Sequence, residues 1–305
     1  MSRDFDILAF DLSSLAYRSY YGLPDSIKGV DGRPVNAIKG YLDSLNRFLK
    51  THHPKSVIHA VDQNWRPSWR VNLLPEYKAH RLEDGNEEDV PDDLDYQLEK
   101  LPQILSDLGM QILGHPNFEA DDVLATISHK FQNVLIITGD RDLLQLINDS
   151  RNIAVHLLGK DGGVLLTEES VFDKYNVRAD QYLDYSVMRG DASDGLPGVK
   201  GVGEKTAAKL LKQFETIEGI IKNLEIDKTN ISSKISQSIL DSTEYIHKAL
   251  KVVKLVNISD LRLHESKEVT LDTSFAKYKG LNIETQLRNY AEIIGSSTSS
   301  KTIGS

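Results

Sequence analysis

The sequence contains no cysteine, which excludes disulfide bonds, thiolate metal sites and a cysteine nucleophile. It also lacks any apolar run long enough to cross a membrane. Acidic residues interrupt the amino-terminal stretch MSRDFDILAFD, where a secretory signal needs an unbroken apolar segment. We therefore expect a cytoplasmic protein without membrane contact.

Positive charge is in deficit: the chain has 36 Lys and Arg against 45 Asp and Glu, a net charge of −9. Proteins that bind nucleic acid usually carry a basic surface, so this sum argues at first against a polyanionic partner. If nine acids gather in one pocket, however, the remaining 45 − 9 = 36 acids balance the 36 basic residues. The rest of the surface can then still hold a basic face.

The chain has 305 residues, enough for one large domain or two smaller ones. Three short β-type runs, at residues 6–12, 55–62 and 133–140, alternate with longer helix-type segments. In one of these segments, 34–52, apolar residues recur at helical spacing. The alternation predicts an α/β fold with a mostly parallel central sheet flanked by helices.

An aspartate stands in or next to the end of each β-type run: Asp11, Asp62 and Asp140. In open α/β sheets, ligands bind beyond the carboxyl ends of the strands, so we expect these three side chains to converge. Carboxylate oxygens are the ligands that hard divalent cations prefer, and phosphoryl transfer needs such cations to offset negative charge.

More acids crowd the start of an expected helix in the segment NFEADDVLA, residues 117–125. Glu119, Asp121 and Asp122 repel one another, so helix capping, solvent exposure or a bound cation must offset them. Any single acid is explained as well by a capping or turn role, but the joint placement at strand ends favours a metal site. The candidate ligands are Asp11, Asp62, Glu119, Asp121, Asp122, Asp140, Asp142, Asp191 and Asp194.

The regular alternation lapses between residues 63 and 100, which predicts a functional lid or a disordered loop. Trp65 and Trp69 lie four residues apart there and either stack on unpaired bases or pack the base of the insertion. An acid run at 83–95 either repels duplex nucleic acid or forms a solvated mobile loop.

A stretch punctuated by glycine, LPGVKGVGEKTAAKLL at 196–211, precedes an expected helix. Glycines with positive φ in a tight hairpin would expose backbone N–H groups that suit phosphate. A solvated helix start with surface lysines is the plainer alternative. The residues of interest are Gly198, Lys200, Gly201, Gly203, Lys205, Thr206, Lys209 and Lys212.

Together these stretches resemble the bacterial 5′ nuclease family, which includes the amino-terminal 5′ to 3′ exonuclease domain of DNA polymerase I and the flap endonucleases. The matching segments are AFDLSSLAYRSYYGLP, AVDQNWRPSWRVNLLPEYKAHR, FEADDVLAT, ITGDRDLLQL and RGDASDGLPGVKGVGEKTAAKLL. They occur in the family's order and cover residues 9 to about 211. One departure is Leu12-Ser13 after the first aspartate, where many relatives have Asp-Gly.

The resemblance implies a role for each site residue. A first metal group corresponds to Asp11, Asp62, Glu119 and Asp121 with Asp122 beside them, and a second to Asp140, Asp142, Asp191 and Asp194. Lys78 and Arg81 match basic residues that contact the scissile phosphate, and Tyr77 matches an aromatic residue near the frayed nucleotide. Arg70 joins Tyr77 and the glycine-stretch residues as a DNA contact.

The resemblance also implies an organisation and an activity. The expected parts are a nuclease core at 1–178 with a helical arch at about 63–100, a helix-hairpin-helix subdomain at 179–255, a segment packing back on the core at 256–295, and a flexible tail at 296–305. The activity is 5′ to 3′ exonuclease and 5′-flap endonuclease action on DNA in replication and repair. Implied cofactors are two or more Mg²⁺ ions, replaceable by Mn²⁺, and K⁺ at the hairpin. Implied partners are DNA flaps, nicks, ends and RNA/DNA primers, and a polymerase or sliding clamp, with the chain as a monomer.

Three other functions fit less well. A PIN-like ribonuclease would share the acid-rich core but lack the helix-hairpin-helix. A non-catalytic module that binds branched DNA would have lost one or more of the nine acids, and all are present. A haloacid-type phosphatase needs a second aspartate two residues after Asp11, where Ser13 stands instead.

Overall fold

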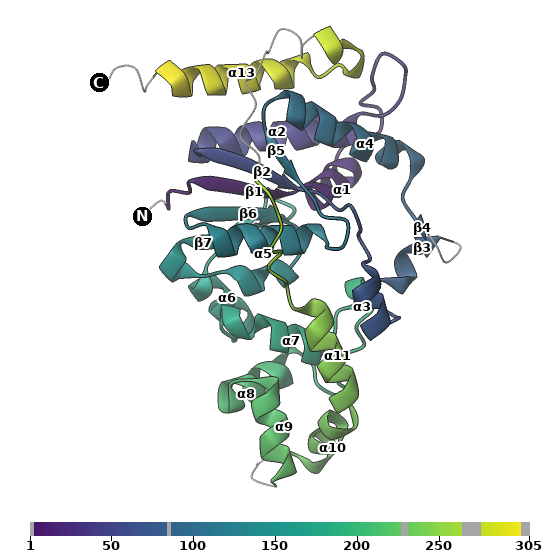
Figure 1. Cartoon of the computed structure of the whole chain (residues 1–305), viewed down its shortest axis with the longest axis vertical. Helices are drawn as coiled ribbons and strands as arrows, with labels where there is room; N and C mark the ends of the chain where they lie inside the picture. The colour runs from purple at the N-terminus through teal and green to yellow at the C-terminus, as the bar shows by residue number, and fades with distance from the viewer. Residues whose placement is uncertain (1–2, 84–86, 227–230, 264–275, 300–305) are drawn as a thin grey trace.

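The computed structural model describes residues 3–83, 87–226, 231–263 and 276–299 (Figure 1). No helix in these ranges is long and apolar enough to cross a membrane. The strands are β1 (Ile7–Asp11), β2 (Ser56–Ala60), β3 (Leu82–Glu83), β4 (Glu87–Glu88), β5 (Gln111–Leu113), β6 (Val134–Thr138), β7 (Ile153–Leu157) and β8 (Val164–Leu166). The α-helices are α1 (Leu12–Gly22), α2 (Asn36–His52), α3 (Ser68–Leu73), α4 (Asp92–Asp107), α5 (Ala120–Lys130), α6 (Glu168–Tyr175), α7 (Tyr182–Arg189), α8 (Glu204–Phe214), α9 (Ile217–Glu225), α10 (Ser233–Asp241), α11 (Thr243–Val253) and α13 (Glu284–Ser299).

The central sheet has six strands in the order β5-β2-β1-β6-β7-β8, and only the β7–β8 pair is antiparallel. This confirms the mostly parallel sheet predicted from the sequence. The three β-type runs form β1, β2 and β6, which are neighbours: β1 pairs with β2 on one side and with β6 on the other. Because these strands are parallel, their carboxyl ends lie side by side.

Hydrophobic clusters cover both faces of the sheet. Successive residues of a strand point to opposite faces, and in β1 Leu8 and Phe10 join the cluster that includes α2, α4 and α13. Ile7 and Ala9 join the other cluster, which includes α5 and continues into α7, α8, α9 and α11. Figure 1 shows α13 lying along α2 at one end of the molecule and α8 to α10 at the other. Burial on both faces explains why the central strands read as continuous apolar runs.

The insertion after β2 consists of two helical legs joined by short elements. Helix α3 and a 3₁₀ turn at Ala79–Arg81 form the first leg, the two-residue strands β3 and β4 pair antiparallel, and α4 forms the second. Helix α4 continues beyond residue 100, the expected end of the insertion, to Asp107 because its apolar face packs into the sheet cluster through Leu101, Ile104 and Leu105. Residues 84–86 of the acid run lie outside the described residues.

The glycine stretch forms the hairpin between α7 and α8. Gly198 (φ 70°) and Gly201 (φ 81°) adopt the left-handed backbone that glycine tolerates best, as the sequence predicts. The expectation for Gly203 is wrong: its φ is −96°, it precedes α8 as the N-cap residue, and a Cβ there would meet nothing within 4 Å.

The carboxyl-terminal helix α13 packs on α2, where the backbone carbonyl of Gln286 accepts from Asn46 and its side chain donates to Asp43. The helix runs to Ser299, so a flexible tail starting at residue 296 is wrong for 296–299; a helix already anchored by packing extends at little cost. Residues 300–305 lie outside the described residues. The domain limits at 178 and 255 stay predictions.

Candidate active site

A cavity of about 880 Å³ opens beyond the carboxyl ends of the central strands. Asp11 is the last residue of β1, and Asp62 and Asp140 follow β2 and β6 by two residues. The structure brings these three together in the cavity wall, with Asp121 from the first turn of α5 and Asp191 from the segment after α7. Five of the nine predicted carboxylates thus share one cavity, as the strand-end argument expected.

Hydrogen bonds fix the strand-end carboxylates. Asp11 accepts from the Ser14 backbone N–H at 3.1 Å, which caps α1, and from the Thr138 hydroxyl at 2.7 Å. Asp62 accepts from the Ala120 N–H at 2.8 Å and from the Ser13 hydroxyl at 3.1 Å. The residue that departs from the family pattern, Ser13, therefore orients one of the predicted ligands.

Glu119, Asp142 and Asp194 do not line the cavity, but they are buried beside it. Burial raises the pKa of Asp142 well above its ordinary value, and the nearby charges of Asp140, Asp194 and Asp191 raise it further. Asp142 therefore lies close enough to the other three acids of the second predicted group to interact with them electrostatically.

Several of the cavity carboxylates lack a counter-charge among the described residues, although Asp191 forms salt bridges. In the part of the chain that the structure describes, Asp11, Asp121 and Asp140 form no salt bridge. Burial, followed by the charge of Asp62, raises the pKa of Asp11 to about 7. Burial, Asp140 and Asp11 raise the pKa of Asp121 well above its ordinary range. Each of these carboxylates would gain from added positive charge.

The donor set fits a hard divalent cation in its chemistry, because carboxylate oxygens from several elements line one cavity. Across the described ranges, however, no three acidic or histidine side chains converge closely enough to hold one ion. Binding of an ion would therefore require some of these side chains to move closer together.

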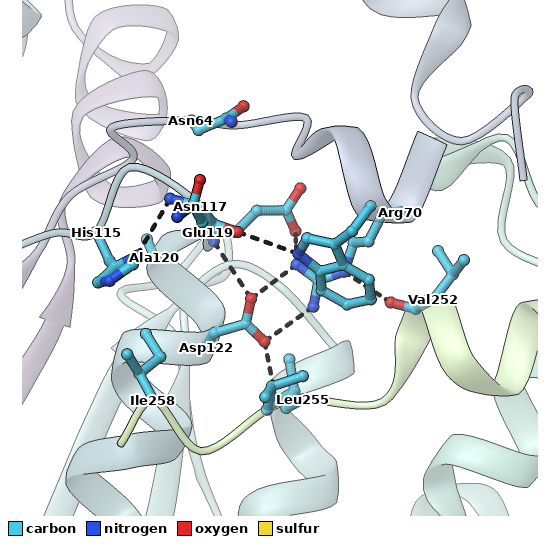
Figure 2. A network of polar contacts seen from close by, with 12 residues as sticks. Asn64, Arg70, His115, Asn117, Glu119, Ala120, Asp122, Val252, Leu255 and Ile258 are labelled. Atoms are coloured by element: carbon cyan, nitrogen blue, oxygen red, sulfur yellow. Dashed lines mark hydrogen bonds and ion pairs between the residues drawn. The ribbon is translucent and has the colours of Figure 1, made fainter. Parts of the chain in front are cut away.

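The opposite side of the α5 start is fully paired, as Figure 2 shows. Arg70, from α3, donates to both oxygens of Asp122 at 2.8 Å, to Glu119 at 3.0 Å and to the Val252 carbonyl of α11 at 2.8 Å. Asp122 also accepts from the backbone N–H groups of Glu119 and Val256. We call Arg70, Glu119 and Asp122 with these partners the Arg70 cluster.

This cluster corrects two expectations. Asp122 does not join the cavity acids, because it is fully buried and both of its oxygens are occupied by protein donors. Arg70 is not available to DNA, because it is 1% exposed and all its contacts lie within the protein. It instead joins the insertion to α5 and to α11.

The structure also contradicts the nucleotide contact that the resemblance implies for Tyr77. Tyr77 is buried, and its hydroxyl donates to Glu119 at 2.9 Å, so its ring is not open to a nucleotide. Glu119 accepts in addition from Lys78 Nζ at 3.2 Å. Burial raises the pKa of Glu119 to about 7, although Lys78 and Arg70 oppose the shift. Glu119 thus lies at the border between the Arg70 cluster and the cavity.

Lys78 and Arg81 both reach the cavity wall. Lys78 has a left-handed backbone (φ 51°), and its N–H donates to the Asp194 carbonyl. Arg81 donates to the Ser193 carbonyl at 2.6 Å and to the Asp194 carboxylate at 3.2 Å. Two cations from the insertion therefore contact carboxylates of the two predicted acid groups.

The two tryptophans have different roles. Trp65 lines the cavity. Trp69 packs against Phe118, donates to the Asn117 carbonyl at 3.0 Å and lies 4.5 Å from the Arg70 guanidinium, so one tryptophan packs the base of the insertion. From the acid run, Glu88, Asp89 and Asp95 line the cavity. Whether this run repels duplex or forms a solvated loop stays a prediction.

Sequence reasoning missed several cavity residues, among them Ser14, Tyr17, His80 and Arg141. Ser13, Ser14 and Tyr17 occupy one face of α1 directly after Asp11, so helical spacing from the first aspartate would have found them.

The hairpin region carries exposed lysines, as both interpretations of the glycine stretch expect. Lys200, Lys205 and Lys209 are exposed, and Thr206 is half-buried. The Gly198 N–H donates to the Tyr245 hydroxyl and the Lys200 carbonyl accepts from the Ser238 hydroxyl, so part of the hairpin backbone is engaged by α10 and α11. Which of these groups contact DNA or K⁺ stays a prediction.

Comparison with known proteins gives consistent matches. Residues 6–176 match the family profile described as 5′-3′ exonuclease, N-terminal resolvase-like domain, and residues 177–276 match that of the 5′-3′ exonuclease, C-terminal SAM fold. A 5′-3′ exonuclease of Streptomyces coelicolor is 41% identical over 256 residues, covering 81% of this chain and 85% of the relative. One from Mycobacterium tuberculosis is 36% identical, covering 84% and 86%.

The chain also matches DNA polymerase I of Thermus thermophilus, described as thermostable, with 38% identity over 77% of this chain but only 27% of the polymerase. Among solved structures, the T5 D15 protein co-crystallised with metal ions has a TM-score of 0.66 at 20% identity, covering 94% of this chain and 98% of that one. The catalytic core of Rad2 in complex with DNA substrate has a TM-score of 0.60 at 15% identity, covering 96% and 93%. At these identities the two structures show a shared fold.

Proposed function

The chain belongs to the 5′-3′ exonuclease family and is a nuclease of the 5′-3′ exonuclease and flap endonuclease type, and from this we propose that it hydrolyses DNA at 5′ ends, nicks and 5′ flaps. The observation that carries the proposal is the cavity at the strand ends. Five of the predicted ligand carboxylates line it, two cations of the insertion reach into it, and Asp11, Asp121 and Asp140 form no salt bridge among the described residues.

We propose divalent cations as cofactors, Mg²⁺ first and Mn²⁺ as a substitute. Asp11, Asp62, Glu119 and Asp121 would hold one group and Asp140, Asp142, Asp191 and Asp194 the other. Divalent ions bound to the T5 enzyme support their use here. When bound, such ions offset charge on the reacting phosphate and lower the pKa of the attacking water. K⁺ at the hairpin is part of the same proposal.

The side chains of the protein then position the phosphate. Lys78 and Arg81 donate to the phosphoryl oxygens from the cavity wall, and their contacts with Glu119 and Asp194 aim them before substrate arrives. Asp62 and Asp11 are themselves oriented by Ser13 and Thr138. Water attacks phosphorus opposite the 3′ oxygen, which leaves, so that the product retains a 5′ phosphate.

The insertion selects the substrate in this proposal. Glu88, Asp89 and Asp95 line the same cavity, so a duplex entering it would bring two phosphate chains against these acids. A single strand carries half that charge, and fraying of a terminal base pair is cheapest at ends and flaps. Exposed lysines of the hairpin, Lys200, Lys205 and Lys209, would hold the duplex on the other side of the cut.

The biological setting is also a proposal. Removal of flaps or RNA primers in replication and repair fits the family's activity. We infer that the chain acts as a monomer in the cytoplasm and that it contacts a DNA polymerase or a sliding clamp.

Cleavage of a 5′-labelled flap duplex, with and without Mg²⁺, tests the function. We expect cutting near the junction that depends on Mg²⁺, and Lys78→Ala should lower the single-turnover rate by about 10²-fold. Lys50→Ala, on the exposed face of α2, is the control and should leave the rate unchanged. Binding of the flap without any cleavage would support instead the non-catalytic DNA-binding module.

A further inference from the structure

A second cavity, of about 630 Å³, lies farther along α1. Helix α1 begins at the catalytic cavity, whose wall includes Ser13, Ser14 and Tyr17. Tyr17 also lines the second cavity, together with residues of the following turns of α1 as far as Gly22. One helix therefore leads from the first cavity to the second.

The second cavity has the opposite charge to the first. Its lining contains three cations, Arg18 of α1, Arg47 of α2 and Lys160 of the loop between β7 and β8, and no acid among the described residues. The chain as a whole has a net charge of −9, so the positive charge of this lining differs from that of the chain as a whole. It suits a phosphate backbone.

The cations come from three separate elements that are held together by specific contacts. The Arg18 guanidinium donates to the Gly159 carbonyl and joins α1 to the loop, while His156 Nε2 hydrogen-bonds to the Gly162 carbonyl and joins the loop to β7. A Cβ at Gly162 would lie 2.9 Å from Arg47 Nη1, so this glycine allows the guanidinium to lie against the loop.

Arg47 and Lys160 are available to a ligand. Both are exposed, and neither forms a salt bridge within the described parts of the chain. Asp161, next to Lys160, does not line the cavity.

Aromatic rings accompany these cations. Tyr17 and Tyr21 lie one turn apart on α1 with ring centroids 6.5 Å apart, and Tyr20 contacts Tyr21 at 5.0 Å. Tyr21 is 70% exposed, so its ring is open to a ligand. An exposed ring beside a basic groove is a pattern by which proteins bind single-stranded nucleic acid, because every base can stack on it.

We propose that this second cavity binds the 5′ single strand of the substrate beyond the catalytic cavity, with Arg47 and Lys160 on its phosphates and Tyr21 against a base. The inference rests on the proposed function and adds a subsite to it. It makes affinity depend on the length of the flap, since a short flap ends before it reaches Lys160.

The test compares Arg47→Ala/Lys160→Ala with a control of equal charge change, Lys50→Ala/Lys174→Ala, whose residues are exposed but outside both cavities. Binding is followed by fluorescence anisotropy in EDTA, on one duplex carrying a 5′ single strand of zero, about 5 or about 15 nucleotides, a range set by typical single-strand site sizes. A fourth substrate carries the long strand at the 3′ side instead.

We expect the cavity variant to lose about tenfold in affinity for the long 5′ strand, with no loss at zero length. Two lost phosphate contacts should also reduce the slope of log K against log salt by about 1.4. Equal loss at every length, loss only on the 3′ strand, or no difference from the control would overturn the inference.

Failure of the proposed function would give a different result from failure of this inference. If the wild-type protein neither binds the flap in EDTA nor cuts it in Mg²⁺, both proposals are overturned. If it binds and cuts normally while the cavity variant behaves like the control, only the second cavity is misassigned.

Discussion

Asp121 and Asp122 are adjacent in sequence, yet they lie in two regions with opposite electrostatics. Asp121 faces the strand-end cavity, where buried carboxylates repel one another and their pKa values rise. Asp122 faces the Arg70 cluster, where every oxygen accepts from a protein donor. A step of one residue rotates a helix by about 100°, which is enough to separate the two environments.

The difference shows how this protein uses buried acids. In the Arg70 cluster, ion pairs and backbone hydrogen bonds hold α3, α5 and α11 in place. In the cavity, unpaired charge is a cost that the folded chain carries until a cation binds. The paired side of α5 thereby holds the unpaired carboxylates in place, and four experiments test this difference.

The largest expected effect is on the paired side. Arg70→Leu leaves Asp122 and Glu119 buried without their cation, so we expect the free energy of unfolding to fall by about 3–5 kcal/mol, measured by urea denaturation. The double variant Arg70→Leu/Asp122→Leu should recover a large part of the loss. A loss below about 1 kcal/mol in the single variant would show that the cluster is not a structural clamp.

The cavity side should respond in the opposite way. Asp121→Asn removes a repelling charge at almost constant shape, so stability in EDTA should stay equal or rise, while the Mg²⁺-dependent cleavage rate should fall by about 10²-fold or more. Asp161→Asn, in an exposed loop, is the control and should change neither quantity. A destabilised but fully active Asp121→Asn protein would reverse our assignment of the two faces.

The pH dependence of stability sharpens the same contrast. Asp11 and Glu119 have pKa values of about 7, raised from ordinary values of 3.8 and 4.5, so the folded state keeps protons that the unfolded state has released. Between about pH 4 and 7 the metal-free protein should therefore lose stability as pH rises. Thermal unfolding in EDTA at pH 5 and 7.5 measures this.

Mg²⁺ at about 100 times its dissociation constant should add about 2.7 kcal/mol at pH 7.5, because it binds the folded state. Asp11→Asn should flatten the profile in EDTA. A melting temperature that increases from pH 5 to 7.5 without metal would contradict the assignment of unpaired acids to the cavity.

The smallest effects separate the two tryptophans. Trp69→Ala removes a hydrogen bond and a contact with Arg70, so stability should fall by about 1–2 kcal/mol with little change in the affinity for DNA. Trp65→Ala should leave stability nearly unchanged and weaken binding of flap DNA by about 1–2 kcal/mol if it stacks on a base. Denaturation and anisotropy on both variants check this, and interchanged results would reject it.

Much of the architecture follows from local pattern. Apolar runs separated by helical segments predict β1, β2 and β6, and the rule that ligands bind at carboxyl strand ends predicts that Asp11, Asp62 and Asp140 meet. The resemblance to a known family then supplied Lys78 and Arg81, which the structure places in the same cavity. It failed for Arg70, Tyr77 and Asp122, because residue type and motif position do not tell which way a side chain points.

The α/β fold, the family, the strand-end acids and the glycine hairpin could be predicted from the amino-acid sequence, because they depend on periodicity and on short motifs that act within a few residues. Which acids are paired and which are not became visible only in the folded chain. Pairing depends on Arg70, Val252 and Val256 arriving at α5 from distant parts of the chain. The same holds for the basic cavity beside α1, since Arg18, Arg47 and Lys160 meet only after three separate elements have packed.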